Sequence, residues 1–116
     1  MTVTYRKTMA LARAGAVAAL LVSGAAVGAD VAAGRAKALM CQACHGTDGL
    51  SKVPEAPNIA GQTESYLAAQ LQAFKAGTRK NETMNVVTAT LSEADVANLA
   101  AYFSAIEIKV VKIPGE

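Results

Sequence analysis

The sequence predicts one small all-α domain. Three observations carry this prediction. A chain of 116 residues allows no more than one domain of ordinary size. Apolar residues recur at helical spacings of three and four in residues 66–74 and 96–103. Each of these segments follows a Thr or Ser that can cap a helix, and neither an internal repeat nor parallel-sheet alternation is present.

Residues 1–29 have the pattern of a secretory signal peptide. Three basic residues precede a run of 16 uncharged residues, 14–29, and small residues at its end permit cleavage before Asp30. An uncleaved membrane anchor is the alternative, but a spanning helix needs about 20 apolar residues and this run is shorter. The basic residues are Arg6, Lys7 and Arg13. We therefore expect a soluble, exported, periplasmic chain of 87 residues with no membrane span after cleavage.

The positive charge of the chain belongs to this leader. The formal net charge of the whole chain is +2, whereas residues 30–116 carry 8 Lys and Arg against 9 Asp and Glu, which gives −1. Because no basic stripe remains, we expect no nucleic-acid partner. Two cysteines are also too few for a disulfide framework.

Three main helices are expected in residues 30–105, which we take as the domain. Asp30 can cap the first helix, because a carboxylate is favoured at a helix N-terminus, and this helix is expected to continue to Met40. Residues 45–61 contain three glycines and two prolines, which is too many for a regular element longer than a turn. They predict a loop.

The other two helices have their own start and stop signals. The second is expected to begin after Thr63 and to end at Gly77. Residues 78–90 are largely polar and favour a loop with one helical turn at most. Ser92, with Asp95 three residues later, resembles a capping box and predicts the start of the last helix.

The chemistry is concentrated in the run Cys41-Gln42-Ala43-Cys44-His45. Residues three apart on a helical turn share a face, so both thiols can add to the two vinyl groups of one porphyrin while the histidine binds iron. We expect one covalent haem c, attached through Cys41 and Cys44, with His45 as an axial iron ligand. A redox-active disulfide would need a βαβ pattern that the sequence lacks. A zinc site would need four protein ligands, and these residues supply three.

With this motif, the chain resembles the class I c-type cytochromes, in particular their small bacterial periplasmic monohaem members. The likeness covers residues 34–105. It implies the cytochrome c fold, with three main helices around one haem c, in which Gly34 permits a close helix crossing and the Pro57 carbonyl accepts a hydrogen bond from His45. The segments that carry it are Gly34-Arg35-Ala36-Lys37-Ala38, Pro57-Asn58-Ile59-Ala60-Gly61, Tyr66-Leu67, Gln70-Leu71, Phe74-Lys75-Ala76-Gly77, Leu91-Ser92-Glu93-Ala94-Asp95-Val96 and Leu99-Ala100-Ala101-Tyr102-Phe103.

The resemblance also implies that a methionine before the last helix is the second axial ligand, and here that residue is Met84. After the leader only Met40 and Met84 remain, and Met40 is bonded to Cys41 on the His45 side of the porphyrin. Elimination therefore also favours Met84, although a methionine is often core filler. Asn85 stands where many class I members have proline, and no tryptophan is present to hold a haem propionate. Candidates for that role are Gln62, Arg79 and Lys80.

A cleaved chain of 87 residues with four aromatic residues would bury only a thin core, so we expect haem to supply the missing apolar centre. Nine apolar residues are expected to face haem or the helix crossing: Leu39, Ile59, Leu67, Leu71, Val86, Val87, Leu91, Val96 and Leu99.

An iron bound by both histidine and methionine keeps no open position for oxygen or peroxide, and thioether ligation raises its potential. The expected function is a periplasmic one-electron carrier, not an enzyme, between a dehydrogenase or quinol-oxidising complex and a terminal oxidase or reductase. One alternative is a haem c subunit fixed to a specific oxidoreductase, docked by strand addition through an extended tail expected over 106–116. We favour packing of that tail on its own domain. Another alternative is a haem enzyme or gas sensor, which requires Met84 to be absent from iron.

Overall fold

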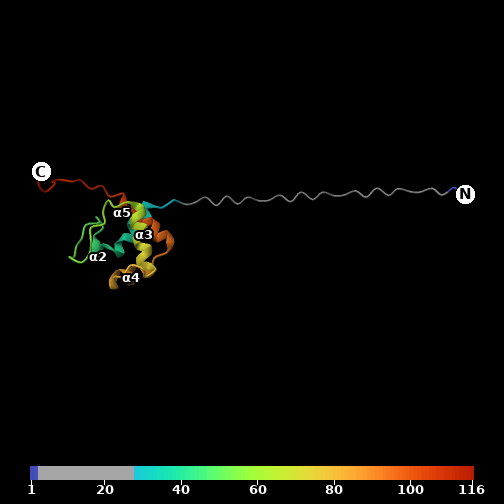
Figure 1. The fold of residues 1–116 in the computed structure, drawn as a ribbon, viewed down its shortest axis with the longest axis horizontal. Coiled ribbons are helices and arrows are strands. Elements are labelled where there is room, and N and C mark those ends of the chain that lie inside the picture. The colour runs from blue at the N-terminus through green and yellow to red at the C-terminus, as the bar shows by residue number, and fades with distance from the viewer. Residues whose placement is uncertain (3–27) are drawn as a thin grey trace.

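The computed structural model describes residues 1–2 and 28–116 (Figure 1). All but the ends of the leader assigned to 1–29 lies outside the described residues. The described part is helical and contains no strand, so the all-α prediction is confirmed. None of its helices is long and apolar enough to cross a membrane. The elements are α1 (Val31–Lys37), a 3₁₀ turn (Ala38–Met40), α2 (Gln42–His45), α3 (Glu64–Lys75), α4 (Glu82–Ala89) and α5 (Glu93–Ser104).

Helix α1 begins where the sequence predicts. The Asp30 carboxylate accepts hydrogen bonds from the backbone N–H groups of Ala32 and Ala33, at 2.8 and 3.1 Å. The backbone N–H of Asp30 donates to the side-chain oxygen of Asn98 on α5, at 2.7 Å. The start of α1 is therefore joined to α5, the helix that it crosses.

Gly34 lies buried at this crossing. A Cβ built on Gly34 would come within 2.0 Å of the backbone oxygen of Asn98 and within 2.8 Å of the Tyr102 Cβ. The backbones of α1 and α5 can approach this closely only because the residue has no side chain.

Replacement of Gly34 is expected to destabilise the protein. Gly34→Val should lower the free energy of unfolding by roughly 2 kcal/mol or more, because overpacking against a backbone carbonyl outweighs the gain of only about 0.4 kcal/mol in helix propensity. The matched control is Ala36→Val, which adds bulk on an exposed position of α1 and should cost only a few tenths. Thermal and denaturant unfolding of the holoproteins measures both. A Gly34→Val protein that melts higher than the parent would contradict the close crossing.

The first helix is shorter than predicted. It ends at Lys37, and the chain tightens into the 3₁₀ turn before α2 begins at Gln42. The tightened turn fully buries Ala38 but leaves Leu39 exposed on the outer surface. The expectation that Leu39 faces haem or the helix crossing is therefore wrong.

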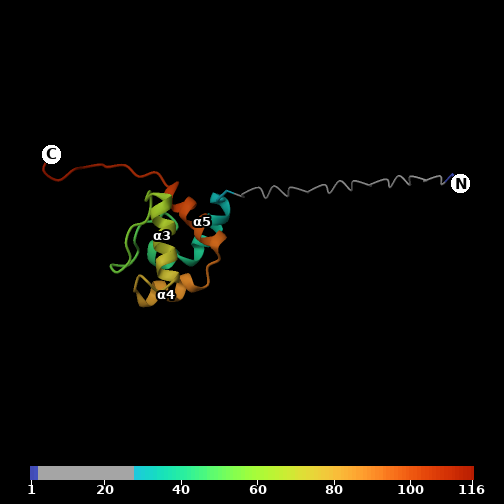
Figure 2. The ribbon, with the colours of Figure 1, turned by 45° about the vertical axis from the view of Figure 1, so that its right-hand side comes forward.

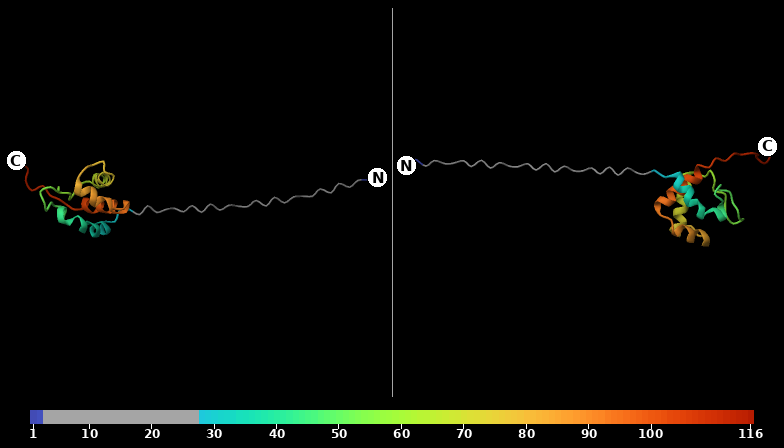
Figure 3. Two further views of the ribbon diagram at one scale, coloured as in Figure 1. Left: turned by 90° about the horizontal axis from the view of Figure 1, so that it is seen from below. Right: turned by 180° about the vertical axis from the view of Figure 1, so that it is seen from behind.

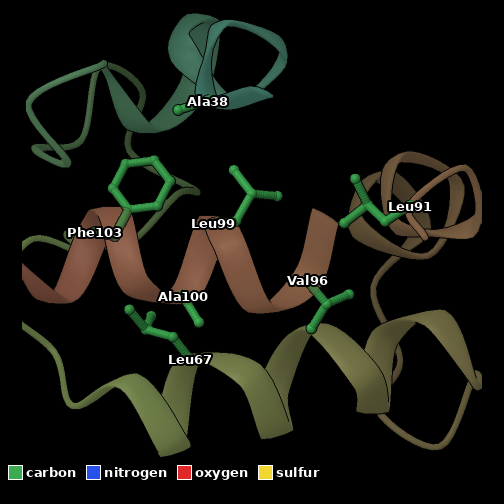
Figure 4. Packing of buried hydrophobic residues seen from close by; sticks show 7 residues of the cluster. All are labelled: Ala38, Leu67, Leu91, Val96, Leu99, Ala100 and Phe103. Carbon is green, nitrogen blue, oxygen red and sulfur yellow. The ribbon is translucent and has the colours of Figure 1, made fainter. Parts of the chain in front are cut away.

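The core is built around α5, which lies between α3 and the segment that carries Ala38 (Figure 4). Leu99 and Phe103 point from α5 toward Ala38, whereas Ala100 points toward Leu67 of α3. Ile59 and Leu71 pack against this cluster as half-buried neighbours. Its buried members are Ala38, Leu67, Leu91, Val96, Leu99, Ala100 and Phe103.

The N-terminus of α5 carries the predicted capping box. The Ser92 hydroxyl accepts from the backbone N–H of Asp95 at 3.0 Å, and the Asp95 carboxylate accepts from the backbone N–H of Ser92 at 2.9 Å. The pKa of Asp95 is lowered, first by the Ser92 N–H and then by Lys37, whose ammonium group lies 3.1 Å away. Because the folded pKa is the lower one, this contribution to stability is present at neutral pH and is lost as the pH falls through that pKa.

The region before α5 differs from its prediction. Residues 78–90 were expected to form a loop, yet Glu82–Ala89 is helix α4. Asn81 caps it through its side-chain oxygen, which accepts from the backbone N–H of Met84 at 2.9 Å. Val87 is half-buried as expected, but Val86 points to solvent and is exposed, so its expected burial is wrong.

After α5 the chain runs as an extended C-terminal tail that leaves the helical body in every view (Figures 1, 2 and 3). Ile106 is half-buried against the core, and Ile108 lies beside Gly61. Farther on, Val110 and Val111 are 79% and 96% exposed. The expectation that the tail packs on its own domain is wrong beyond Ile108.

Candidate haem c site

The five residues predicted to attach haem, bind iron or orient its ligand line one cleft of about 380 Å³, a volume in the range of small-molecule and cofactor sites. It lies between the α2 turn, the loop through Pro57 and helices α3, α4 and α5. The five residues brought together are Cys41, Cys44, His45, Pro57 and Met84. The apolar lining is provided by Val53, Ile59, Leu67, Leu71, Phe74, Val87, Leu99 and Phe103.

The two thiols are held on one helical turn. The backbone N–H of His45 donates to the Cys41 carbonyl at 2.9 Å, which closes the turn and places both cysteines on the cleft. Both cysteines are half-buried, and they are not joined to each other by a disulfide. Burial raises the pKa of the Cys41 thiol, and the nearby Cys44 adds to the rise. In the described part of the chain, no three His, Cys, Asp or Glu side chains gather as a metal site, so the zinc alternative has no donor set there.

His45 is buried, and its Nδ1 lies 2.9 Å from the carbonyl oxygen of Pro57. A carbonyl oxygen can only accept, so Nδ1–H is the donor and the lone pair belongs to Nε2. This contact to the backbone fixes the tautomer and the orientation of the ring, as partners of metal-binding histidines do. The side chain therefore suits an iron ligand.

The loop that carries Pro57 is folded back by its own backbone. The carbonyl of Gly49 accepts hydrogen bonds from the N–H groups of Ile59 and Ala60, at 2.8 and 3.0 Å. Gly49 has φ of +70°, and a Cβ there would come within 2.8 Å of Ala60. The glycine permits both the turn and the close approach that brings Pro57 to His45.

Met84 is half-buried in the first turn of α4, where neighbouring side chains hold its backbone. Its N–H donates to the side chain of Asn81, and its carbonyl accepts from the Thr88 hydroxyl at 2.7 Å. Thr88 itself is fully buried. The peptide groups on both sides of Met84 are thereby fixed.

Asn85 joins this turn to α3. Its side-chain amide donates to the carbonyls of Phe74 and Arg79, at 2.6 and 2.9 Å, and its oxygen accepts from the N–H of Asn81 at 2.8 Å. Sequence reasoning treated Asn85 only as a departure from proline. The available signal was Asn81 as a helix cap, followed by apolar residues at helical spacing: Met84, Val87 and Leu91.

Loss of the Asn85 amide is expected to loosen the Met84 turn. Asn85→Ala leaves two backbone carbonyls and one N–H without their partner and should cost about 1–3 kcal/mol of stability. If Met84 binds iron, the sulfur-to-iron charge-transfer absorption band of the oxidised protein should also weaken, while covalent haem is retained. Asn85→Asp keeps the acceptor and removes both donors, so it should share the effect. Glu82→Ala, at an exposed position of the same helix, is the control; equal spectra in all variants would contradict a positioning role.

Two of the three candidates for the propionates lie at the cleft. Arg79 and Gln62 line it, whereas Lys80 is not among its lining residues. The Arg79 guanidinium lies 4.5 Å from the Phe74 ring centroid and donates to the Gln70 side chain at 2.5 Å. These contacts hold a cation at the edge of an otherwise largely apolar cleft.

A helical fold in which a C-x-x-C-H turn opens on an apolar cleft, with a buried histidine oriented by a backbone carbonyl, defines the class of haem c proteins. The sequence model of the family described as Cytochrome c matches residues 31–106. The chain belongs to the cytochrome c family. It accordingly carries covalent haem c, the cofactor with which members of this family transfer electrons.

The chain is similar to one relative of about its own domain length and to another that is more than twice as long. Cytochrome c4 of Pseudomonas aeruginosa is 46% identical over 81 residues, which cover 70% of this chain and 40% of that protein. Cytochrome c-554(548) of Halomonas halodenitrificans is 42% identical over 81 residues, covering 67% of this chain and 98% of that protein. The chain thus spans less than half the length of the cytochrome c4 relative.

A third relative and a solved structure extend the likeness. The thiosulfate dehydrogenase electron acceptor of Thiomonas intermedia is 41% identical over 101 residues, 85% of this chain and 46% of that protein. The crystal structure of reduced recombinant cytochrome c4 from Pseudomonas stutzeri superposes with a TM-score of 0.64 at 42% identity, covering 68% of this chain and 46% of that one.

Proposed function

We propose that this chain is a periplasmic one-electron carrier whose haem iron is bound by His45 and Met84 and whose haem is attached through Cys41 and Cys44. In this proposal residues 1–29 are a signal peptide cleaved before Asp30, residues 30–105 form the cytochrome c domain and residues 106–116 form a tail. The observation that carries the ligand assignment is that all four side chains, with the Pro57 carbonyl behind His45, line the same apolar cleft.

Bound haem supplies a reversible one-electron couple at iron. His45 would bind iron through Nε2, because its Nδ1–H donates a hydrogen bond to the Pro57 carbonyl. Met84 offers a thioether, a soft ligand that favours the reduced state and raises the potential. If His45 and Met84 both bind iron, they would leave no position there for oxygen or peroxide. The apolar lining limits water around the site, which also tunes the potential.

The partners are redox proteins. On the donor side we propose a dehydrogenase or quinol-oxidising complex, and on the acceptor side a terminal oxidase or reductase. A second candidate is a haem c subunit fixed to one oxidoreductase. It is favoured by the relative named thiosulfate dehydrogenase electron acceptor and by a similar chain in a thiosulfate dehydrogenase structure (TsdBA) from Marichromatium purpuratum, which has a TM-score of 0.62 at 39% identity and covers 66% of this chain and 19% of that one.

Spectroscopy of the purified holoprotein tests the carrier function. We expect a pyridine haemochrome with two thioether links, a one-electron Nernst titration and no rapid binding of carbon monoxide by the reduced protein. Rapid carbon monoxide binding or peroxide turnover would overturn it. Size fractionation of a native periplasmic extract separates the two candidates, because a free carrier elutes apart from any oxidoreductase and a fixed subunit elutes with one.

A further inference from the structure

The tail after α5 has an unpartnered backbone. Within the described part of the chain, no hydrogen bond involves the backbone N–H or C=O groups of residues 107–112. The segment is extended and carries β-branched residues at five of its eight positions from 106 to 113. An exposed, extended segment of this composition is a template for pairing with another strand.

The side chains of the tail sort onto two faces, because alternate residues of an extended chain point in opposite directions. Ile106, Ile108 and Val110 share one face, and Glu107 and Lys109 share the other with Val111. Ile106 packs on the core and Ile108 lies beside Gly61, so the first face is turned toward the domain near its start. Val110, on the same face, is 79% exposed.

We propose that this tail pairs in antiparallel register with the tail of a second copy of the chain, centred on Ile108. In this register Glu107 of each copy lies opposite Lys109 of the other, which gives two cross-strand charge pairs on the face that carries Glu107 and Lys109, here called the outer face. On the opposite, inner face Ile106 lies opposite the second copy's Val110, and the two Ile108 side chains lie opposite each other. The paired segment covers residues 106–110, a common strand length, and begins directly after Ala105, the C-cap residue of α5.

Two identical antiparallel tails can pair in several symmetric registers, each centred on one residue, and the charges favour the register centred on Ile108. Centring the pair on Glu107 or on Lys109 would place identical charges directly opposite, which destabilises a sheet. Centring it on Val110 would place Glu107 opposite Ile113 and Ile108 opposite Lys112. Only the register centred on Ile108 joins opposite charges and keeps apolar residues opposite apolar residues.

An isolated two-stranded ribbon is marginal in water, but this ribbon would not be isolated. Its inner face continues from Ile106, which already packs on the core of its own domain. Because Val110 of each copy lies opposite Ile106 of the other, pairing would carry the exposed Val110 over the second copy's domain, next to Gly61. The dimer thereby buries apolar side chains that the single chain leaves in solvent.

The test is the mass of the holoprotein in solution, by sedimentation over a range of concentrations, for the parent and for charge variants. We expect a reversible dimer. Glu107→Lys and Lys109→Glu should each weaken it about tenfold or more, since each replaces two attractive cross-strand pairs by two repulsive ones. The double variant, with the charges exchanged, should restore it. Lys112→Glu lies outside the paired segment and should leave the dimer unchanged.

Three results would overturn the proposal. They are a parent that stays monomeric up to about 1 mM, a dimer that persists after truncation following Ala105, and a dimer whose strength the charge exchange does not restore. A chain that is monomeric alone but loses a co-purifying oxidoreductase upon that truncation would assign the tail to strand addition on a different protein. None of these outcomes depends on the identity of the iron ligands.

Discussion

A double variant, Cys41→Ser with Cys44→Ser, is expected to carry no covalent haem and to fold poorly. Serine hydroxyls do not form thioethers, so attachment is lost. The cleft of about 380 Å³ then lacks its apolar filling. Without haem the apolar side chains that line the cleft face water, and this exposure destabilises the domain. Because small domains are only marginally stable, we expect this loss to unfold a large part of the protein. Haem-stained denaturing gels and far-UV circular dichroism measure both effects.

Single variants and a matched control separate attachment from general damage. Cys41→Ser and Cys44→Ser should each lower haem incorporation and leave the remaining haem joined by one bond, with a shifted haemochrome band. Ala43→Ser introduces a hydroxyl at the exposed position between them and should change neither haem content nor stability. Normal covalent haem in the double variant would contradict the attachment assignment.

Local signals were sufficient for much of the fold. Asp30 and Ser92 cap their helices as predicted, because a side-chain acceptor and a backbone donor two or three residues away need no tertiary context. The spacing of Cys41, Cys44 and His45 likewise defines one helical turn. The carbonyl of Pro57 was expected from a family resemblance, since nothing in the local sequence links it to a histidine twelve residues earlier.

The features that the sequence did not predict depend on tertiary contacts. Asn85 is hydrogen-bonded to carbonyls six and eleven residues earlier, and no short-range pattern encodes such a pair. Leu39 and Val86 are apolar residues at helical spacing, but the 3₁₀ turn and the direction of α4 turn them to solvent. The exposure of the tail also could not be predicted from local sequence. It depends on tertiary contacts, and the apolar residues beyond Ile108 do not pack against their own domain.

Replacement of Met84 by alanine is expected to change the iron centre without detaching haem, because attachment uses only Cys41 and Cys44. The sulfur-to-iron charge-transfer band of the oxidised protein should vanish, and the reduced protein should bind carbon monoxide readily. The potential should fall by on the order of 100 mV, within the ~0.8 V range that axial ligands span. Visible spectra, potentiometry and carbon monoxide titration of the same preparation measure all three.

Met40→Leu is a demanding control, because Met40 also lines the cleft and is the other methionine of residues 30–116. It ends the 3₁₀ turn and is bonded directly to Cys41, so we expect its sulfur to lie on the His45 side of a haem attached through Cys41. Leucine keeps its bulk and removes only the thioether, and none of the three observables should move. If Met40→Leu abolishes the band while Met84→Ala does not, the ligand assignment is wrong. If the parent already binds carbon monoxide rapidly, the second axial position is open, and the electron carrier that depends on its closure is replaced by a ligand-binding haem protein.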